Sequence, residues 1–472
     1  MANLADFHPL TPVRDWRNGQ AFRIADALTG VAVFGATGSG KTSGVAKHLA
    51  LGYLAGDFGG LVLCAKKEER VQWQAWAEAT GREDDLVIVD ASATWRFNFL
   101  DWEASRVGEG GGLTINIVAL LDEIAGAIAG KAGKEEGGGD NKFFDDALHH
   151  MNQNLVDLPI FAGIPVSLPL LRSIVVTAPT SLKELQDSDW QQTSTCAAII
   201  AEAERNLKNA PQEVKDDFEE CRNYWLREFP VLAEKTRSII VLSFSMLVRP
   251  FITRPLRRLF STDTTITPED TFKGKIIIVD LPIQEFRLAG RVANLAWKYC
   301  FQVAVMRRMQ TQRGYVRPVF LWADEAQNFV SDFDAEYQAV ARSAGGCTVY
   351  LTQNRESYRR VLGNDDAVDS LLGNLQSKFF CQNSGDTNEW AAKLLGERWI
   401  QVAGTNVSRN DQGSSGGVSR NEQRRFFVEP SRFTTLKRGG DVYDFQVETI
   451  VYKGGHLFED GLPFKMLTFN QR

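Results

Sequence analysis

The stretch GATGSGKT, residues 35–42, follows the apolar run VAVF at 31–34 and opens the helical pattern TSGVAKHLALGYLA at 42–55. It fits GxxxxGK[ST] in the context that this pattern requires, a strand, a glycine-rich turn and then a helix. The glycines let backbone N–H groups surround phosphate oxygens, and the helix N-terminus adds positive potential. We therefore predict a phosphate-binding loop formed by Gly35, Ala36, Thr37, Gly38, Ser39, Gly40, Lys41, Thr42 and Ser43.

Two side chains of this loop carry specific chemistry. Lys41 places a point charge beside the β- and γ-phosphates, and the Thr42 hydroxyl is a ligand for Mg²⁺. The pattern therefore predicts binding of ATP together with Mg²⁺.

Short apolar runs alternate with helical patterns on both sides of a long middle segment. The runs read as buried strands at 31–34, 59–64, 86–90, 275–280, 319–323, 347–352 and 377–381. Alternation of strand and helix is typical of a parallel sheet covered by helices. The fold class predicted is α/β, a P-loop nucleotide-binding domain with a parallel-sheet core.

The middle segment has a different character. From about residue 113 it holds helical patterns, and SIVVTA at 173–178 is the one candidate strand. We expect an inserted all-α domain at 113–235, with the nucleotide-binding domain divided into 1–112 and 236–472. The Gly-, Ser- and Asn-rich stretch 404–423 predicts an exposed hairpin tip or an irregular loop.

A phosphate-binding loop needs an acidic site at the end of a neighbouring strand. VFLWADE at 319–325 supplies a pair, in which Asp324 would hold Mg²⁺ and Glu325 would polarise the attacking water as the catalytic base. Asp90 and Asp280 also end strands and are alternatives for the magnesium role. Each stands alone, so the adjacent pair favours Asp324 and Glu325.

Two further residues are candidates for catalysis. Gln353 ends the next strand, where its amide could hydrogen-bond the water or sense hydrolysis; a polar strand end is the alternative. Arg342 precedes that strand and could act as an arginine finger toward a neighbouring subunit. A surface arginine is the alternative reading of Arg342.

The amino-acid composition limits which functions and binding partners remain possible. The net charge of −6 excludes a protein that coats nucleic acid with its whole surface, so DNA contacts must come from local basic patches. The six cysteines form no CxxC pair, which argues against zinc and for a reducing cytoplasm. No stretch reaches the roughly 18 apolar residues that a membrane span needs, so we expect no direct membrane insertion.

Together these pieces resemble the coupling-protein ATPases of conjugation and type IV secretion, the TraG/TraD type, within the RecA-like group that includes the FtsK and HerA translocases. The matching segments run nearly the length of the chain. They are GATGSGKTSG at 35–44, FNFLD at 97–101, FFDDA at 143–147, GKIIIVDLP at 274–282, FLWADEAQNF at 320–329, ARSAGGCTVYLTQN at 341–354, the segment 374–397 that ends in LLGE, and RRFFVEPSRFTTLKRGG at 424–440.

The resemblance implies a RecA-like domain interrupted by the family's all-α domain, and an ATP-driven DNA translocase that works as a homo-hexamer. A monomer is expected at low concentration. It also strengthens Arg342 as a finger acting in trans. A relaxase, or a secretion-system or membrane protein, would be a partner, and such a partner could recruit this cytoplasmic chain to the inner membrane. The alternatives are a soluble HerA-like motor working with a nuclease and an ATP-dependent switch that recruits proteins.

Four arginine-rich clusters are candidates for contacts with DNA phosphates, although each could equally be a solvated or ion-paired surface. They lie at Arg249, Arg254, Arg257 and Arg258; at Arg307, Arg308, Arg313 and Arg317; at Arg355, Arg359 and Arg360; and at Arg424, Arg425, Arg432, Lys437 and Arg438. The sequence alone does not choose among them.

Overall fold

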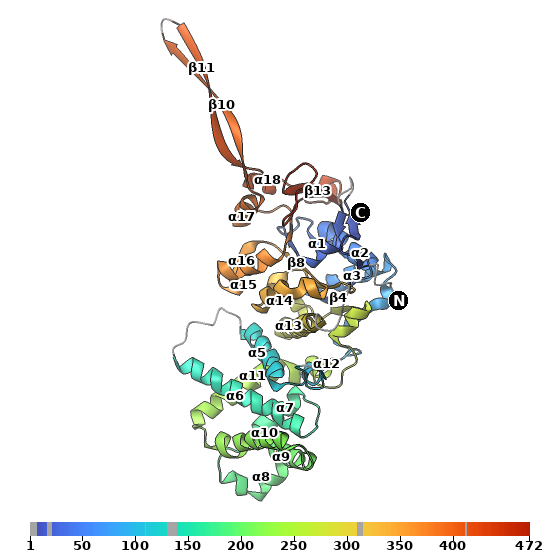
Figure 1. The fold of residues 1–472 in the computed structure, drawn as a ribbon, viewed down its shortest axis with the longest axis vertical. Helices are drawn as coiled ribbons and strands as arrows, with labels where there is room; N and C mark the ends of the chain where they lie inside the picture. The colour runs from blue at the N-terminus through green and yellow to red at the C-terminus, as the bar shows by residue number, and fades with distance from the viewer. Residues whose placement is uncertain (1–6, 17–20, 109, 130–138, 309–314, 411–412) are drawn as a thin grey trace. The chain divides into compact units, whose positions relative to one another are not determined.

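The computed structural model describes all residues except 1–6, 17–20, 109, 130–138, 309–314 and 411–412 (Figure 1). Side chains at 127–142 and 405–419 also lie outside this description. The chain divides into two compact units. The first unit contains 1–58, 76–81 and 312–472, and the second contains 59–75 and 82–311.

The first unit is built on a six-stranded mixed sheet in the order β13-β12-β9-β3-β8-β7. Strands β3 (Val31–Phe34), β7 (Val319–Ala323), β8 (Gly346–Thr352) and β9 (Ser377–Phe380) are parallel and buried along their whole length. Burial on both faces explains why these strands read as continuous apolar runs rather than as alternating ones. The predicted parallel core is confirmed.

Two strands at one edge of this sheet were not predicted from the sequence. β12 (Gln446–Lys453) runs antiparallel to β9, and β13 (Phe464–Asn470) runs antiparallel to β12. The sheet is therefore mixed, with its antiparallel part formed by the last strands of the chain.

Helices and short strands complete the first unit. They are β1 (Pro12–Asp15), β2 (Ala21–Arg23), α1 (Ile24–Leu28), the π-helical turn Thr42–Ala46, α2 (Lys47–Ala55), α14 (Phe333–Ala341), α15 (Arg355–Leu362), α16 (Asp365–Asn374), α17 (Asp386–Leu395) and α18 (Pro430–Thr434). The predicted exposed hairpin exists and is longer than the sequence suggested. β10 (Glu397–Asn410) and β11 (Gly413–Phe426) pair along their full length and project from α17 and α18 (Figure 1).

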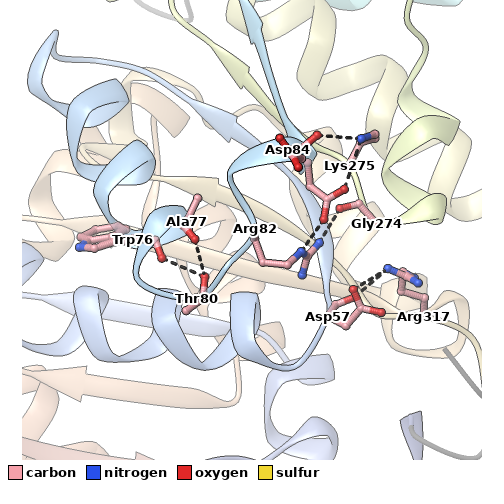
Figure 2. A network of polar contacts seen from close by, with 10 residues as sticks. Asp57, Trp76, Ala77, Thr80, Arg82, Asp84, Gly274, Lys275 and Arg317 are labelled. Carbon is pink, nitrogen blue, oxygen red and sulfur yellow. Dashed lines mark hydrogen bonds and ion pairs between the residues drawn. The ribbon is translucent and has the colours of Figure 1, made fainter. Parts of the chain in front are cut away.

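The second unit contains a three-stranded parallel sheet in the order β4-β6-β5, formed by Gly59–Leu63, Ile276–Val279 and Leu86–Val89. Polar contacts fix the amino ends of two of its strands (Figure 2). The Arg82 guanidinium donates to the Gly274 carbonyl at 2.7 Å and pairs with Asp85 at 2.6 Å. The Lys275 ammonium donates to the Asp84 carbonyl at 2.9 Å.

The same unit holds the long helical segment. Its helices are α3 (Glu68–Glu78), which begins in this unit, α4 (Phe99–Ala104), α5 (Thr114–Ala129), α6 (Gly139–Phe161), α7 (Leu168–Val176), α8 (Ser188–Thr193), α9 (Thr195–Asn206), α10 (Gln212–Asn223), α11 (Glu234–Ile252), α12 (Leu256–Phe260) and α13 (Ile283–Arg308). Strands are absent between residues 90 and 275 wherever this segment is described. The boundaries 112/113 and 235/236 remain predictions.

One secondary-structure prediction in this segment was wrong. SIVVTA at 173–178 lies mainly in α7, not in a strand. α7 follows Ser167, carries Pro169 in its first turn, and buries Leu171, Ile174 and Val175 on one face. Packing of that face against α11 outweighs the strand preference of its β-branched residues.

Candidate nucleotide-hydrolysis site

The phosphate-binding loop begins where β3 ends, at the carboxyl edge of the parallel strands. The Gly35 amide donates to the Thr352 carbonyl at 3.2 Å, and the Ala36 amide donates to the Gln382 carbonyl at 2.9 Å. The start of the loop is thus fastened to the ends of β8 and of the neighbouring β9. Thr37 and Gly38 are exposed at its tip, whereas Ser39 is fully buried.

Glycine is required at the turn into the helix. Gly40 has φ = 81°, in the left-handed region, and a Cβ there would meet the Val447 side chain and the Arg438 carbonyl. Residues near the carboxyl end of the chain therefore line one side of the loop. The Ser43 hydroxyl extends this contact by accepting a hydrogen bond from the Gln471 amide at 2.5 Å.

The loop and the acidic pair meet in the first unit. The Thr42 hydroxyl donates to Asp324 Oδ2 at 2.7 Å, and Lys41 Nζ lies 3.7 Å from Glu325 Oε1. The Lys41, Asp324 and Glu325 side chains are all buried or nearly so. The structure thus brings together four residues that the sequence separates by more than 280 positions.

The backbone at the acidic pair is unusual. Glu325 has φ = 51° and ψ = 46°, a left-handed conformation that a non-glycine residue adopts at an energetic cost. The Asn328 side chain and backbone amide both donate to the Glu325 carbonyl, at 3.0 and 2.9 Å, and hold the turn. Asp324 Oδ1 accepts from the Glu325 amide at 2.8 Å.

A residue that the sequence did not single out connects this pair to β8. Gln327 donates from Nε2 to Glu325 Oε2 at 2.8 Å, and its Oε1 accepts from the Thr352 hydroxyl at 2.9 Å. Gln327 therefore bridges the carboxylate and the end of the strand that precedes Gln353. The available signal was its place two residues after Glu325, in the turn that follows β7.

Gln353 is placed by its backbone. Its carbonyl accepts from the Asn383 side chain at 2.6 Å, and its own side chain is half-buried where β8 ends. The following residue, Asn354, caps α15 by accepting from the Ser357 amide at 2.9 Å. Gln353 thus lies at the same sheet edge as the phosphate-binding loop, as expected.

Arg342 lies at the other end of β8. It is exposed in the turn after α14 and precedes the amino end of the strand, whereas the loop lies at the carboxyl end. The seven residues of β8 span roughly 20 Å. The structure does not bring Arg342 together with the loop of its own chain.

The two rival carboxylates are engaged elsewhere. Asp90 and Asp280 both pair with Arg70 in the second unit, at 3.2 and 2.8 Å. The hydrogen bond with Asp280, the larger favourable contribution, and the nearby Asp90 raise the pKa of Arg70. These contacts favour Asp324 for the magnesium role.

A buried wall lies behind the acidic pair. The Tyr350 hydroxyl donates to the fully buried Asp334 at 2.6 Å. Burial raises the pKa of Tyr358 well above its usual value, and the negative charges of Asp334 and Glu325 act in the same direction. Burial likewise raises the pKa of Tyr350, so both phenols stay neutral.

The residues fit a nucleotide with Mg²⁺. The Ser39 hydroxyl is buried without a hydrogen-bond partner among the described residues, next to Gly38, where a Cβ atom would meet no neighbouring atom within 4 Å. Thr42 and Asp324 offer oxygen ligands, which Mg²⁺ prefers when phosphates and water complete its shell. Within the part of the chain that the structure describes, clusters of three or more His, Cys, Asp or Glu suited to a metal are absent.

The fold and this site define a RecA-type P-loop nucleotide-binding protein. The protein family described as "TraM recognition site of TraD and TraG" matches residues 318–438. A comparison with curated proteins finds no match to this sequence. Among the described residues, none of the helices is long and apolar enough to cross a membrane.

Solved structures are similar over almost the whole chain. The bacterial conjugative coupling protein TrwBdeltaN70, in an unbound form, is 15% identical with a TM-score of 0.62, covering 98% of this chain and 88% of its own. The plasmid coupling protein TrwB with ADP and Mg²⁺ is 15% identical with a TM-score of 0.61, covering 98% and 89%. VirB4 of Thermoanaerobacter pseudethanolicus is 13% identical with a TM-score of 0.51, covering 93% and 88%. The resemblance to coupling proteins is confirmed.

Proposed function

We propose that this chain is an ATPase motor of the coupling type, which translocates DNA or nucleoprotein in conjugation, type IV secretion or a related process. The observation that carries the proposal is the contact of Thr42 with Asp324 at 2.7 Å beside Glu325, inside a fold similar to coupling proteins over 98% of the chain. The contact supports hydrolysis, and the fold supports its use in a motor.

The chain's own residues divide the work of ATP hydrolysis. Backbone amides of the loop and Lys41 bind the β- and γ-phosphates, and Thr42 and Asp324 hold Mg²⁺, which when bound neutralises charge that develops on the phosphate oxygens. TrwB has been solved with ADP and Mg²⁺, which supports a nucleotide bound together with Mg²⁺ here. Glu325 accepts the proton of the attacking water as the terminal phosphoryl bond breaks, and ADP and phosphate are released.

Assembly would complete the site. Arg342 is too far along β8 to reach the loop of its own chain, so we propose that it acts on the loop of a neighbouring copy in a hexamer. DNA would be contacted in a sequence-tolerant way. The matched family is named for TraM recognition, which supports a relaxosome or relaxase-type partner, and such a partner could also recruit the chain to the inner membrane.

The test compares wild type with Glu325→Gln, which keeps the size of the side chain and removes the base. We expect unchanged ATP binding and turnover slower by roughly 10²-fold or more. We also expect DNA to stimulate wild-type turnover, and ATP, Mg²⁺ and DNA together to drive Glu325→Gln into hexamers detectable by mass photometry.

Two results would refute parts of this proposal. Full turnover in Glu325→Gln would remove Glu325 from catalysis. A protein that stays monomeric under these conditions, with turnover indifferent to DNA, would exclude the motor and leave an ATP-dependent recruitment switch. Lys41→Ala is the matched control, because it should lose ATP binding as well as turnover.

A further inference from the structure

The four arginine clusters differ in how many of their side chains form ion pairs with carboxylates. Arg307 pairs with Glu103 at 2.6 Å, and Arg317 with Asp57 at 2.9 Å. Arg355 pairs with Asp365 at 2.9 Å. In the fourth cluster, Arg424 and Arg432 pair with Glu397 and Glu448, at 3.2 and 3.4 Å, whereas the described residues show no ion pair for Arg425, Lys437 or Arg438.

The cluster at the junction of α11 and α12 differs. Arg249, Arg254, Arg257 and Arg258 are all exposed, and the described residues place no carboxylate in an ion pair with any of them. We call these four residues the junction patch.

The junction patch also has no acidic neighbours along the chain. The 28 residues 235–262 contain six Lys and Arg and no Asp or Glu, in a chain whose net charge is −6. The next acidic residue, Asp263, is held by Arg96 at 2.6 Å. That ion pair keeps the pKa of Asp263 well below its usual range, so its charge is already matched.

The patch is displayed on a fixed backbone. Phe251 of α11 and Phe260 of α12 contact each other with ring centroids 5.6 Å apart, and both contact Phe99, at 5.4 and 5.9 Å. Leu256 and Leu259 are buried on the inner side of α12, which leaves Arg257 and Arg258 on its outer side.

Hydrogen bonds fasten the turn between the two helices. The Thr253 hydroxyl donates to the Arg249 carbonyl at 3.1 Å, and the Ser261 hydroxyl donates to the Phe251 carbonyl at 3.1 Å. The four arginine side chains therefore project from a backbone that is already fixed. Binding an anion there would not require the backbone to become ordered first.

We propose that the junction patch binds the phosphate backbone of nucleic acid. This inference rests on the proposed function and assigns a DNA-contacting surface to it. Every cation of the patch is arginine, whose planar guanidinium contacts phosphate oxygens in pairs. Exposed arginines that have no carboxylate partner displace the counterions condensed on the nucleic acid when they bind its phosphates. The release of these counterions drives affinity.

The positions of the aromatic residues indicate whether the patch can stack on bases or can only contact phosphates. All three in the segment, Phe244, Phe251 and Phe260, are buried, so the patch offers no ring on which an unpaired base could stack. α11 also exposes Leu242 and Met246, so a protein interface is the alternative that the experiment has to exclude. The patch should therefore bind duplex and single strand by charge and tolerate any sequence.

The experiment removes two of the four charges. Arg257→Ala/Arg258→Ala is compared with Lys183→Ala/Lys208→Ala, which removes the same charge from exposed lysines of the same helical segment. Binding of wild type and both variants to a labelled mixed-sequence duplex, and to one of its strands, is measured by fluorescence anisotropy between about 50 and about 200 mM salt.

We expect wild-type and control proteins to bind alike. Arg257→Ala/Arg258→Ala should bind duplex on the order of 10- to 60-fold more weakly near 0.1 M salt, because each lost contact removes about 0.9 from the salt slope. ATP turnover without DNA should be unchanged, because the patch shares no residue with the hydrolysis site.

Three outcomes overturn the inference. If wild type binds DNA and the arginine variant binds equally well, the patch is not the contact and the proposed function stands. If wild type binds no DNA at all, the motor proposal fails with it. If DNA affinity is unchanged but hexamers or capture of an acidic partner protein are lost, the patch is a protein interface.

Discussion

Gln327 offers a direct test of the candidate hydrolysis site, because its side chain makes two hydrogen bonds and no other polar contact among the described residues. Gln327→Ala deletes its bond to Glu325 Oε2, at 2.8 Å, and its bond from the Thr352 hydroxyl, at 2.9 Å. Lys41, Thr42 and Asp324 keep their contacts. ATP binding should therefore survive, while Glu325, the proposed base, loses its orientation.

The expected fall in kcat follows from the hydrogen bond between Gln327 and Glu325. A hydrogen bond to a charged acceptor contributes about 1.5–3 kcal/mol, and each 1.36 kcal/mol of barrier is tenfold in rate. If the orientation of Glu325 matters fully in the transition state, kcat should fall by about 10- to 150-fold. KM for ATP should stay close to the wild-type value, which distinguishes a lost positioning role from a damaged phosphate-binding loop.

Thr352→Val isolates the second bond. It removes the hydroxyl that holds Gln327, together with that hydroxyl's longer contact to the Asn354 carbonyl at 3.4 Å. The bond to Gln327 is worth about 0.5–1.5 kcal/mol, so kcat should fall by about 2- to 12-fold. Steady-state ATPase assays of both single variants and the double variant form a cycle. Thr352→Val should have little effect once Gln327 is absent. Wild-type kcat in Gln327→Ala, or fully additive effects, would refute the bridge.

Two further predictions concern other parts of the first unit. Mixing Arg342→Ala with Lys41→Ala subunits should restore ATPase activity, because a mixed interface can join an intact loop to an intact arginine; demonstrably mixed rings without recovery would exclude a trans role. Burial lowers the pKa of Lys378 to about 8, so the unfolded chain binds more protons between about pH 8 and pH 10 and stability should rise with pH there. Lys378→Met removes the buried charge and also its hydrogen bond to the Leu375 carbonyl at 2.6 Å, so the pH dependence is the test. In chemical denaturation the stability of wild type relative to Lys378→Met should rise from pH 7 to pH 10; a constant difference would show that Lys378 is already neutral.

The placement of the candidate site residues could be predicted where the signals in the sequence are local. The glycine-rich loop fits between a strand and a helix, and the acidic pair ends another strand, so parallel pairing brings both to one sheet edge. That rule places Thr42 against Asp324 across 282 positions. It also places Gln353, because its strand lies between the other two.

The features that escaped prediction depend on contacts remote in sequence. The role of Gln327 follows from the left-handed turn at Glu325, which no residue pattern announces. α7 is helical because Ile174 and Val175 pack against other helices, although their β-branched side chains favour a strand. The sequence also did not separate the arginine clusters, because ion pairing is decided by which carboxylates the fold brings near.

The direction of β8 gives the strongest physical reason to expect cooperation between copies. Its carboxyl end contributes Thr352 and Gln353 to the hydrolysis site, and Arg342 precedes its amino end, roughly 20 Å away. A guanidinium reaches far less than that distance, and β8 is buried along its whole length and paired on both sides, so it cannot bend to bring Arg342 closer. Within one copy, therefore, Arg342 and Glu325 cannot act on the same phosphate. Only a second copy that presents its own Arg342 can do so, and activity carried by this arginine must then rise with protein concentration.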